Sequence, residues 1–348
     1  MREVAVVGFA QRQMKEFDGS PTCVELLVPI FAELYEQTGF ARQDIGFWCS
    51  GSSDYLAGRS FSFVSAVDAI GALPPVNESH VEMDAAWALY EAWVKIQTGE
   101  VDTALVYGFG KASAGVLRRT LALQLDPYTM TPLWPDAVSI AALQARLGIE
   151  TGAWDEKAMA EVAHRSLTDA CVHAIRRGSE SVSDLLARPV YADPLRKHDI
   201  APVSDGAAAV VLAADDRARS ACERPAWITG IAHSVDPLQL GHRDLTDAPS
   251  ARRAGEAVGL HGLDVAELHA PFSHQELVLR AALGLTGDVH INPSGGALVA
   301  NPMFTAGLNR IGEAARKVWD GSASRALGHA TSGPALQQNL VCVMEGRS

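Results

Sequence analysis

Cysteine is scarce in this chain of 348 residues, and no pair of cysteines has the spacing of metal ligands. An odd number of cysteines without a Cys-x-x-Cys pair argues against both a disulfide framework and a zinc site. We therefore expect no bound metal, and reduced, mostly buried thiols in a cytoplasmic protein. The five residues are Cys23, Cys49, Cys171, Cys222 and Cys342.

Basic residues are also fewer than acidic residues. The chain has 29 Lys and Arg against 41 Asp and Glu, a formal net charge of -12. Nucleic acid is thus not expected as the main partner, because phosphate binding needs a clustered basic surface. A small anionic ligand held by a few arginines and backbone amides stays open.

Long apolar runs are missing too. No run approaches the roughly eighteen residues that a membrane-spanning helix needs, so no membrane association is expected. The N-terminal apolar stretch MREVAVVGFA is short and leads directly into further patterned sequence. It therefore predicts a strand and not a signal peptide.

The first 110 residues alternate apolar, β-branched runs with segments of helical periodicity. This alternation predicts an α/β protein with a mostly parallel sheet covered by helices. The expected strands are Val4–Phe9, Asp44–Ser50, Val81–Met83 and Asp102–Phe109. The expected helices are Thr22–Thr38, one ending at Ala69, and Ala85–Thr98.

Residues 111–202 differ from what precedes them, being punctuated by Pro, Ser and Asp. We interpret them as an inserted, largely helical excursion with helices over Ala137–Leu147 and Glu156–Arg177. The chain then returns to the sheet with a strand at Asp205–Ala213, and a new strand starts at Ala226–His233.

From there the sequence repeats its first half. The helix-to-strand junction Gly39–Ile45 has a counterpart at Gly259–Val265, 220 positions later. Glu91, Lys95 and Gly99 match Glu313, Lys317 and Gly321, each 222 positions on. Two matches in the same order at nearly the same offset predict a tandem duplication of one α/β unit. Strand ends of the two halves should then meet at a ligand-binding crevice.

Polar side chains follow the expected strands of the second half. His269 and His329 come after strands, and Asn301 lies in a Gly-rich loop before a helix. Histidine exchanges protons near neutral pH, and an amide can hold an oxyanion, so a common pocket is expected. Each histidine taken singly is equally compatible with a structural role. His274, on an expected helix, favours a packing or solvated role, and Gly295-Gly296 either approaches a ligand or forms a tight turn.

Three motifs carry a family resemblance: His269-Ala-Pro-Phe272, then Asn292-Pro-Ser-Gly-Gly296 followed by Ala300-Asn-Pro302, and Gly328-His-Ala-Thr331. They resemble motifs of the thiolase superfamily, most closely its sterol-carrier-protein-type or lipid-transfer-protein branch. The resemblance covers essentially the whole chain. It implies duplicated βαβαβ units forming a five-layered α-β-α-β-α core, with an inserted helical loop domain. The implied domains are 1–110 with 203–222, 111–202, and 223–348.

The chain departs from the thiolase pattern at the nucleophile. The reactive cysteine should lie within Glu82–Ala86, a stretch without cysteine, and Cys49 falls a full element too early. Asn301 stands where thiolases have a histidine, and Pro271 where they have a cysteine. Without a thiolate no acyl-enzyme forms, so ordinary thiolysis is not expected.

Two functions remain compatible with the resemblance. In one, the chain breaks or makes a C–C bond in a lipid- or steroid-derived acyl-CoA by a retro-aldol step, with no covalently bound cofactor. His269 would act as base, His329 and Asn301 would stabilise the thioester oxygen, and Ser294, Gly295 and Gly296 would approach the CoA. In the other, it is a silent subunit assembling with an active homologue.

The resemblance also implies partners. It implies a homodimer or a heterodimer with a thiolase-like homologue through sheet edges, and an OB-fold/zinc-ribbon partner protein. CoA would bind under the inserted domain, with its phosphates near basic residues within Arg165–Lys197.

Overall fold

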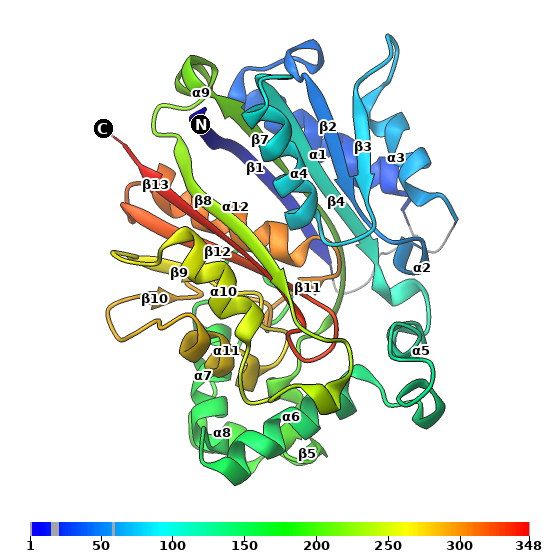
Figure 1. Ribbon diagram of the computed structural model, residues 1–348, viewed down its shortest axis with the longest axis vertical. Helices are drawn as coiled ribbons and strands as arrows, with labels where there is room; N and C mark the ends of the chain where they lie inside the picture. Colours follow the sequence, from blue (N-terminus) through cyan, green and yellow to red (C-terminus); the bar gives the residue numbers. More distant parts are fainter. Residues whose placement is uncertain (1, 15–20, 58–59, 348) are drawn as a thin grey trace.

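The computed structural model describes residues 2–14, 21–57 and 60–347, and these residues build an eleven-stranded sheet (Figure 1). Each half contributes five strands to a path of ten, and, numbered along the sequence of each half, they lie side by side in the order third, second, fourth, fifth, first. In the first half this order is β3 (Glu78–Val81), β2 (Phe47–Gly51), β4 (Thr103–Lys111), β7 (Val203–Ala214) and β1 (Val4–Met14). In the second it is β10 (His290–Ile291), β9 (Val265–Glu267), β12 (Arg325–Ser332), β13 (Gln338–Gly346) and β8 (Ala226–Val235). The two-residue β11 (Asn301–Pro302) pairs with β7 off this main strand order. The halves join where β1 and β8 pair antiparallel, with Ala5 opposite Trp227.

The sheet is mixed, and the expectation of a mostly parallel sheet was wrong. Strands β2, β3 and β4 are mutually parallel, as are β9, β10 and β12. Strand β7 runs antiparallel to β1 and β4, and β13 runs antiparallel to β12 and β8. The reason lies in the connections: β13 follows β12 after a five-residue turn, too short for the crossover that a parallel pair requires.

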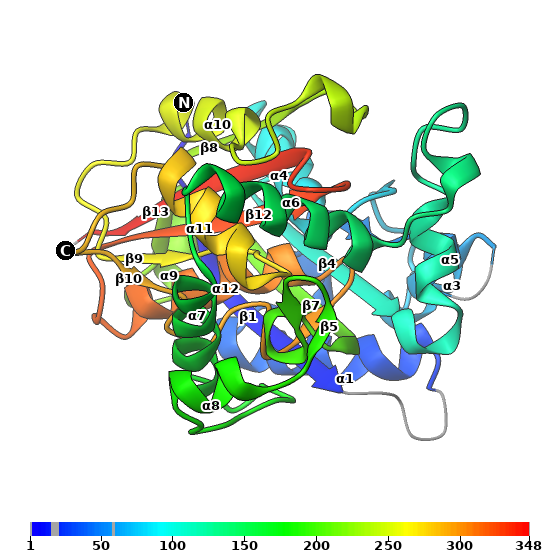
Figure 2. The ribbon, with the colours of Figure 1, turned by 90° about the horizontal axis from the view of Figure 1, so that it is seen from below.

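Alternate side chains of the strands pack into separate helical layers. On β1, Val4 and Val6 face the central helices α4 (Ala85–Gln97) and α12 (Ala306–Trp319), whereas Ala5 and Val7 face α1 (Cys23–Thr38). The outer face of the second half is covered by α10 (Pro249–Val258) and α11 (Ser273–Ala282). Figure 2 shows this stacking, with α10 on one side and α1 on the other. The layers follow the expected order α-β-α-β-α.

Local sequence signals account for the helix boundaries in the first half. Thr22 caps α1 in a capping box with Glu25, and Gly39 ends the helix in the left-handed conformation at φ 68°. Helix α4 begins after Asp84, whose side chain accepts from the Ala86 amide. The remaining helices of this half are α2 (Asp54–Ala57), α3 (Ser62–Ile70) and, after β7, α9 (Asp215–Ala221).

The inserted segment lies along one end of the sheet (Figure 1). It contains α5 (Leu117–Ala122), α6 (Ala137–Thr151), α7 (Glu156–Thr168), α8 (Val182–Ala187) and a hairpin of β5 (Val190–Ala192) with β6 (Leu195–Arg196). Helix α7 ends nine residues before the expected Arg177. Beyond it, the Cys171 amide donates to the Ser294 carbonyl and the Arg176 amide to the Val299 carbonyl. These long-range bonds replace the helical ones.

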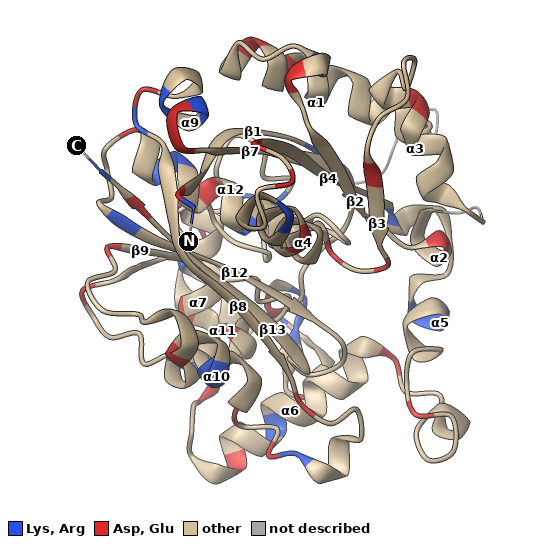
Figure 3. Ribbon diagram, turned by 45° about the horizontal axis from the view of Figure 1, so that its top comes forward, with Lys and Arg blue, Asp and Glu red and all other residues tan. Residues whose placement is uncertain are grey.

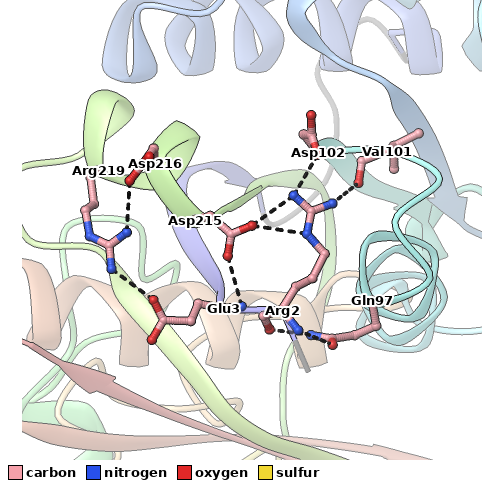
Figure 4. Close-up of polar contacts among 8 residues, drawn as sticks. All are labelled: Arg2, Glu3, Gln97, Val101, Asp102, Asp215, Asp216 and Arg219. Carbon is pink, nitrogen blue, oxygen red and sulfur yellow. Dashed lines mark hydrogen bonds and ion pairs between the residues drawn. The ribbon is translucent and has the colours of Figure 1, made fainter.

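The start of β1 is held by a polar cluster (Figure 4). Arg2 bridges Asp102, at 2.7 Å, and Asp215, at 2.9 Å, while Arg219 pairs with Glu3. These side chains are partly or largely exposed, so each pair contributes little to stability. The cluster ties the first strand to the beginnings of β4 and α9.

Charged residues occupy mainly the helices and loops around a largely uncharged sheet (Figure 3). Within the described residues, no helix has the length and apolar character to cross a membrane.

Candidate active site

A cavity of about 820 Å³ lies between the inserted segment and the strand ends of the second half. Its wall is formed by α5, the start of α6, and the segments 197–204, 269–275, 301–304 and 331–336. Most of the lining is apolar, which is typical of small-molecule sites. The groups with acid–base or charged character are few: Asp84, Arg118, Arg176, Tyr191, Lys197 and His269.

His269 lies on the wall of this cavity with both ring nitrogens engaged. Its Nδ1 accepts from the Thr331 amide at 3.3 Å, so the proton sits on Nε2, which lies 2.9 Å from Asn301 Oδ1. Burial lowers the pKa of His269 to about 3, although the Asn301 contact opposes this shift. The ring is therefore a neutral donor at physiological pH. Acting as the expected base would require it to leave one of these contacts.

Asn301 is held from both sides. Strand β11 (Asn301–Pro302) pairs with Val203 and Ser204 of β7, and the Asn301 amide donates to Ser204 Oγ at 3.0 Å. Because its carboxamide oxygen accepts from His269, the Nδ2 end is left as the donor, and the described residues supply no partner for it. Asn301 also lines the cavity. The pair His269–Asn301 thus offers a fixed hydrogen-bond donor to a bound oxygen.

His329 does not reach the cavity wall. It was expected after a strand ending at Leu327, but β12 continues to Ser332 because β13 pairs with it throughout. The ring is fully buried, with Nε2 3.0 Å from Asn339 Oδ1, and burial lowers its pKa to about 4. Asn339 in turn donates to Ser250 Oγ and the Leu336 carbonyl. His329 therefore belongs to a buried polar network beside the site.

His274 is likewise buried. It lies on α11, as expected, with Nε2 3.1 Å from Gln144 Oε1. Burial lowers its pKa to about 3. Its surroundings are those of a packing residue, joining α11 to α6.

Ser294, Gly295 and Gly296 lie away from the cavity lining. Ser294 is buried, donates to Glu267 Oε2 at 2.7 Å and contacts Arg310. Glu267 and Arg310 form a buried ion pair at 2.7 Å. A Cβ on Gly295 would lie 2.9 Å from the Ser166 carbonyl of α7. A Cβ on Gly296 would lie 2.9 Å from Asn292 Nδ2, so these glycines permit close approach to the protein's own atoms.

The stretch 82–86, where a thiolase would carry its nucleophile, forms the beginning of α4. Asp84 is buried there and lines the cavity. Its carboxylate accepts from three amides, those of Ala86, Gly307 and Leu308, at 2.9–3.1 Å. This residue was not among the expected site residues. The sequence signal, an Asp directly before a helix, indicates only an N-cap.

None of the five cysteines, all of which are described, lines the cavity. Cys49 and Cys342 are fully buried in the central core, and burial raises the pKa of each thiol to about 12. Both are unreactive thiols near neutral pH. In the same described residues, no group of three His, Cys, Asp or Glu side chains could hold a metal ion.

Two cations from the range expected to meet CoA phosphates line the cavity, Arg176 and Lys197. Arg176 is also anchored, donating to the Lys197 and Ile200 carbonyls. Arg165 is instead engaged with the buried Glu276. Arg176 and Lys197 therefore face the cavity, whereas Arg165 lies outside its lining and stabilises the fold.

No family model matches the chain. The acetyl-CoA acetyltransferase of Methanothermobacter thermautotrophicus is 32% identical over 164 residues, 40% of this chain and 42% of the relative. The acetyl-CoA acetyltransferase of Methanocaldococcus jannaschii is 25% identical over 350 residues, 90% of this chain and 89% of the relative. The stronger local match therefore spans less than half of that relative's length.

Solved structures match over nearly the full length. The Ltp2-ChsH2(DUF35) aldolase superposes with a TM-score of 0.81 at 18% identity, covering 99% of this chain and 98% of that chain. Human mitochondrial 3-ketoacyl-CoA thiolase gives 0.79 at 16% identity, covering 100% and 99%. The fold is the thiolase fold. The expected fold class is thereby confirmed, and at these identities the likeness establishes the fold alone.

Proposed function

We propose that this thiolase-fold chain binds an acyl-CoA thioester in the cavity and cleaves or forms a carbon–carbon bond in it without a covalent intermediate. The observation that carries the proposal is the His269–Asn301 pair on the wall of a large, mainly apolar cavity. A fixed amide donor stabilises an oxygen on which negative charge develops, and that is the requirement of enolate chemistry. The absence of a cysteine from the cavity lining of the described chain agrees with a non-covalent route.

A retro-aldol step fits these groups. A base takes the β-hydroxyl proton of a β-hydroxyacyl-CoA, the Cα–Cβ bond breaks, and a carbonyl compound leaves. The electron pair remains on the acyl-CoA as an enolate, whose oxygen accepts from Asn301 Nδ2. His269 keeps the Asn301 carboxamide in this orientation. An apolar wall around about 820 Å³ suits a bulky lipid- or steroid-derived acyl chain.

The similar proteins support the substrate class and the reaction. The two curated relatives named above are acetyl-CoA acetyltransferases, and one structural neighbour is an aldolase that contains ChsH2(DUF35). They support an acyl-CoA ligand and a DUF35-type partner protein for this chain, and an OB-fold/zinc-ribbon architecture of that partner stays a prediction. A dimer and a cytoplasmic location stay predictions.

The second candidate is a silent thiolase-like subunit that assembles with an active homologue. His269 favours it, since both ring nitrogens of the expected base are engaged and burial lowers its pKa to about 3.

Calorimetric titration with CoA and propionyl-CoA tests the proposal, on the protein alone and with any copurifying partner. Gly115 lines the cavity and a Cβ there meets no atom within 4 Å, so Gly115→Trp should fill the cavity without disturbing the backbone. Gly241 also has open space and lies outside the cavity, which makes Gly241→Trp the matched control. We expect CoA and propionyl-CoA to bind the wild type and Gly241→Trp, and not to bind Gly115→Trp. The mass of the protein should not increase, because no acyl-enzyme forms. Absence of binding with and without the partner would favour the silent subunit.

A further inference from the structure

Asp84 joins the N-termini of the two central helices. It caps α4 through the Ala86 amide, and it accepts from Gly307 and Leu308 in the first turn of α12. Oδ1 takes two of these bonds and Oδ2 takes one. A carboxylate offers about four acceptor positions, so one position on Oδ2 is left. The side chain is rigidly held and still borders the cavity.

Asp84 is the only carboxyl group among the described residues that line the cavity. The other ionisable groups are poorly suited to take a proton. His269 has both nitrogens in hydrogen bonds, and Arg118, Arg176 and Lys197 are cations. Tyr191 is 52% exposed, so solvent surrounds much of its side chain and it is not enclosed by the cavity. Burial raises the pKa of Asp84 despite its three amide donors, which makes it a better proton acceptor than a surface aspartate.

Asp84 and Asn301 are positioned by the same short segment. The chain leaves β11 at Pro302, and two residues later the Phe304 carbonyl accepts from the Ala85 amide at 2.9 Å. Three residues further, the Gly307 amide binds Asp84. Gly307 allows this contact, because a Cβ there would lie 2.8 Å from Asp84 Oδ1. Met303 and Phe304 of this segment also line the cavity.

We propose that Asp84 is the catalytic base of the carbon–carbon bond cleavage, acting together with the Asn301 donor that lines the same cavity. This inference rests on the proposed function. Asp84 Oδ2 takes the β-hydroxyl proton as the Cα–Cβ bond breaks, and the protonated carboxyl then gives that proton to Cα of the enolate. The carbonyl compound and the acyl-CoA leave, and Asp84 returns to its ionised form. No oxidant, reductant or further reactant is needed.

The reverse of the last step supplies a test that does not require the natural substrate. If Asp84 exchanges a proton with Cα, the protein should catalyse replacement of the Cα protons of propionyl-CoA by deuterium in D₂O, followed by mass spectrometry. Asp84→Ser keeps a capping oxygen and removes the carboxyl group. We expect it to lower the exchange rate by about 10²–10⁴-fold with propionyl-CoA affinity within a few-fold of wild type. Asp155, the exposed N-cap of α7 outside the cavity, gives the matched control Asp155→Ser, with exchange unchanged.

Asp84→Asn serves as a second variant if Asp84→Ser fails to fold, since its carbonyl oxygen can keep the bonds to Ala86 and Leu308. Formate added to Asp84→Gly should restore part of the exchange because it supplies a carboxylate base, whereas formamide, which accepts from the same amides but is a far weaker base, should not. The inference is overturned if a folded Asp84 variant exchanges the Cα protons as fast as the wild type does. It is also overturned if the wild type binds propionyl-CoA but exchanges none of its Cα protons. Failure of the wild type to bind propionyl-CoA at all overturns the proposed function itself, and the inference with it.

Discussion

His269 donates its Nε2 proton to the carboxamide oxygen of Asn301 across 2.9 Å. The Thr331 amide fixes this tautomer by occupying Nδ1. The contact orients Asn301 so that its amide nitrogen is the end left for a ligand. The histidine is thus a positioning residue in our proposal, and Asn301 is the group that touches the substrate.

Replacing Asn301 should impair the chemistry more than binding. We expect Asn301→Ala to lower the rate of Cα exchange in propionyl-CoA by about 10²–10³-fold, because an oxyanion donor acts mainly on the charge developed in the transition state. Affinity measured by calorimetry should change only a few-fold. His269→Ala, which leaves Asn301 unoriented, should lower the rate as well. Equal losses in affinity and rate for Asn301→Ala would instead indicate a binding residue.

The buried histidines should make the fold sensitive to acid. The folded-state pKa values of His269, His274 and His329 are lowered to about 3, 3 and 4, below the value of about 6.5 for unfolded chains. The unfolded state therefore binds more protons, so this contribution to stability is fully present above pH 6.5 and is lost as the pH falls towards 4. Each histidine contributes about 1.4 kcal/mol per pH unit within that window.

His274→Gln isolates one of these contributions, since glutamine can still donate to Gln144. Denaturant unfolding at pH 7, 6 and 5 should give a shallower loss of stability for this variant. Parallel curves for variant and wild type would show that His274 does not titrate with unfolding.

Ser294 should matter for stability and not for the ligand. Ser294→Ala removes a buried hydroxyl from the Glu267–Arg310 ion pair, and we expect a loss of about 1–3 kcal/mol in the free energy of unfolding. Propionyl-CoA affinity should be unaffected because Ser294 lies outside the cavity lining. Ser322→Ala, at an exposed hydroxyl, is the control and should change stability by less than about 0.5 kcal/mol. Reduced affinity in a stable Ser294→Ala protein would restore a ligand-binding role for this loop.

Lys197 should recognise the phosphates of CoA. We expect Lys197→Gln to weaken CoA binding about tenfold at low salt and less at high salt, because exposed charges are screened. A pantetheine thioester, which carries no phosphate, should bind wild type and variant equally. Lys157→Gln, on the exposed face of α7, should bind CoA like the wild type. The same loss for the pantetheine thioester would assign Lys197 to the acyl end of the site.

Local signals in the sequence determined much of the frame. The helical spacing over Thr22–Thr38 predicted α1 to within one residue, and the structure shows it capped by Thr22 with Glu25 and ended by Gly39, through bonds within one turn. The matched positions Glu91 and Glu313 indicated the duplication, which the identical strand order of the two halves reflects. The resemblance of the motifs around His269 and Asn301 led to the thiolase fold.

Other features depended on contacts between distant parts of the chain. The apolar pattern before His329 ends at Leu327, but pairing with β13 extends the strand and buries the ring. Helix α7 ends early because its continuation bonds to residues 294–299. Asp84 has the local pattern of a helix cap, and only packing of α12 against α4 brings two further amides to it at the cavity wall. Sequence patterns report bonds within a helix or strand, whereas the site is assembled from bonds between separate elements, 32 residues apart for His269 and Asn301 and 223 for Asp84 and Gly307.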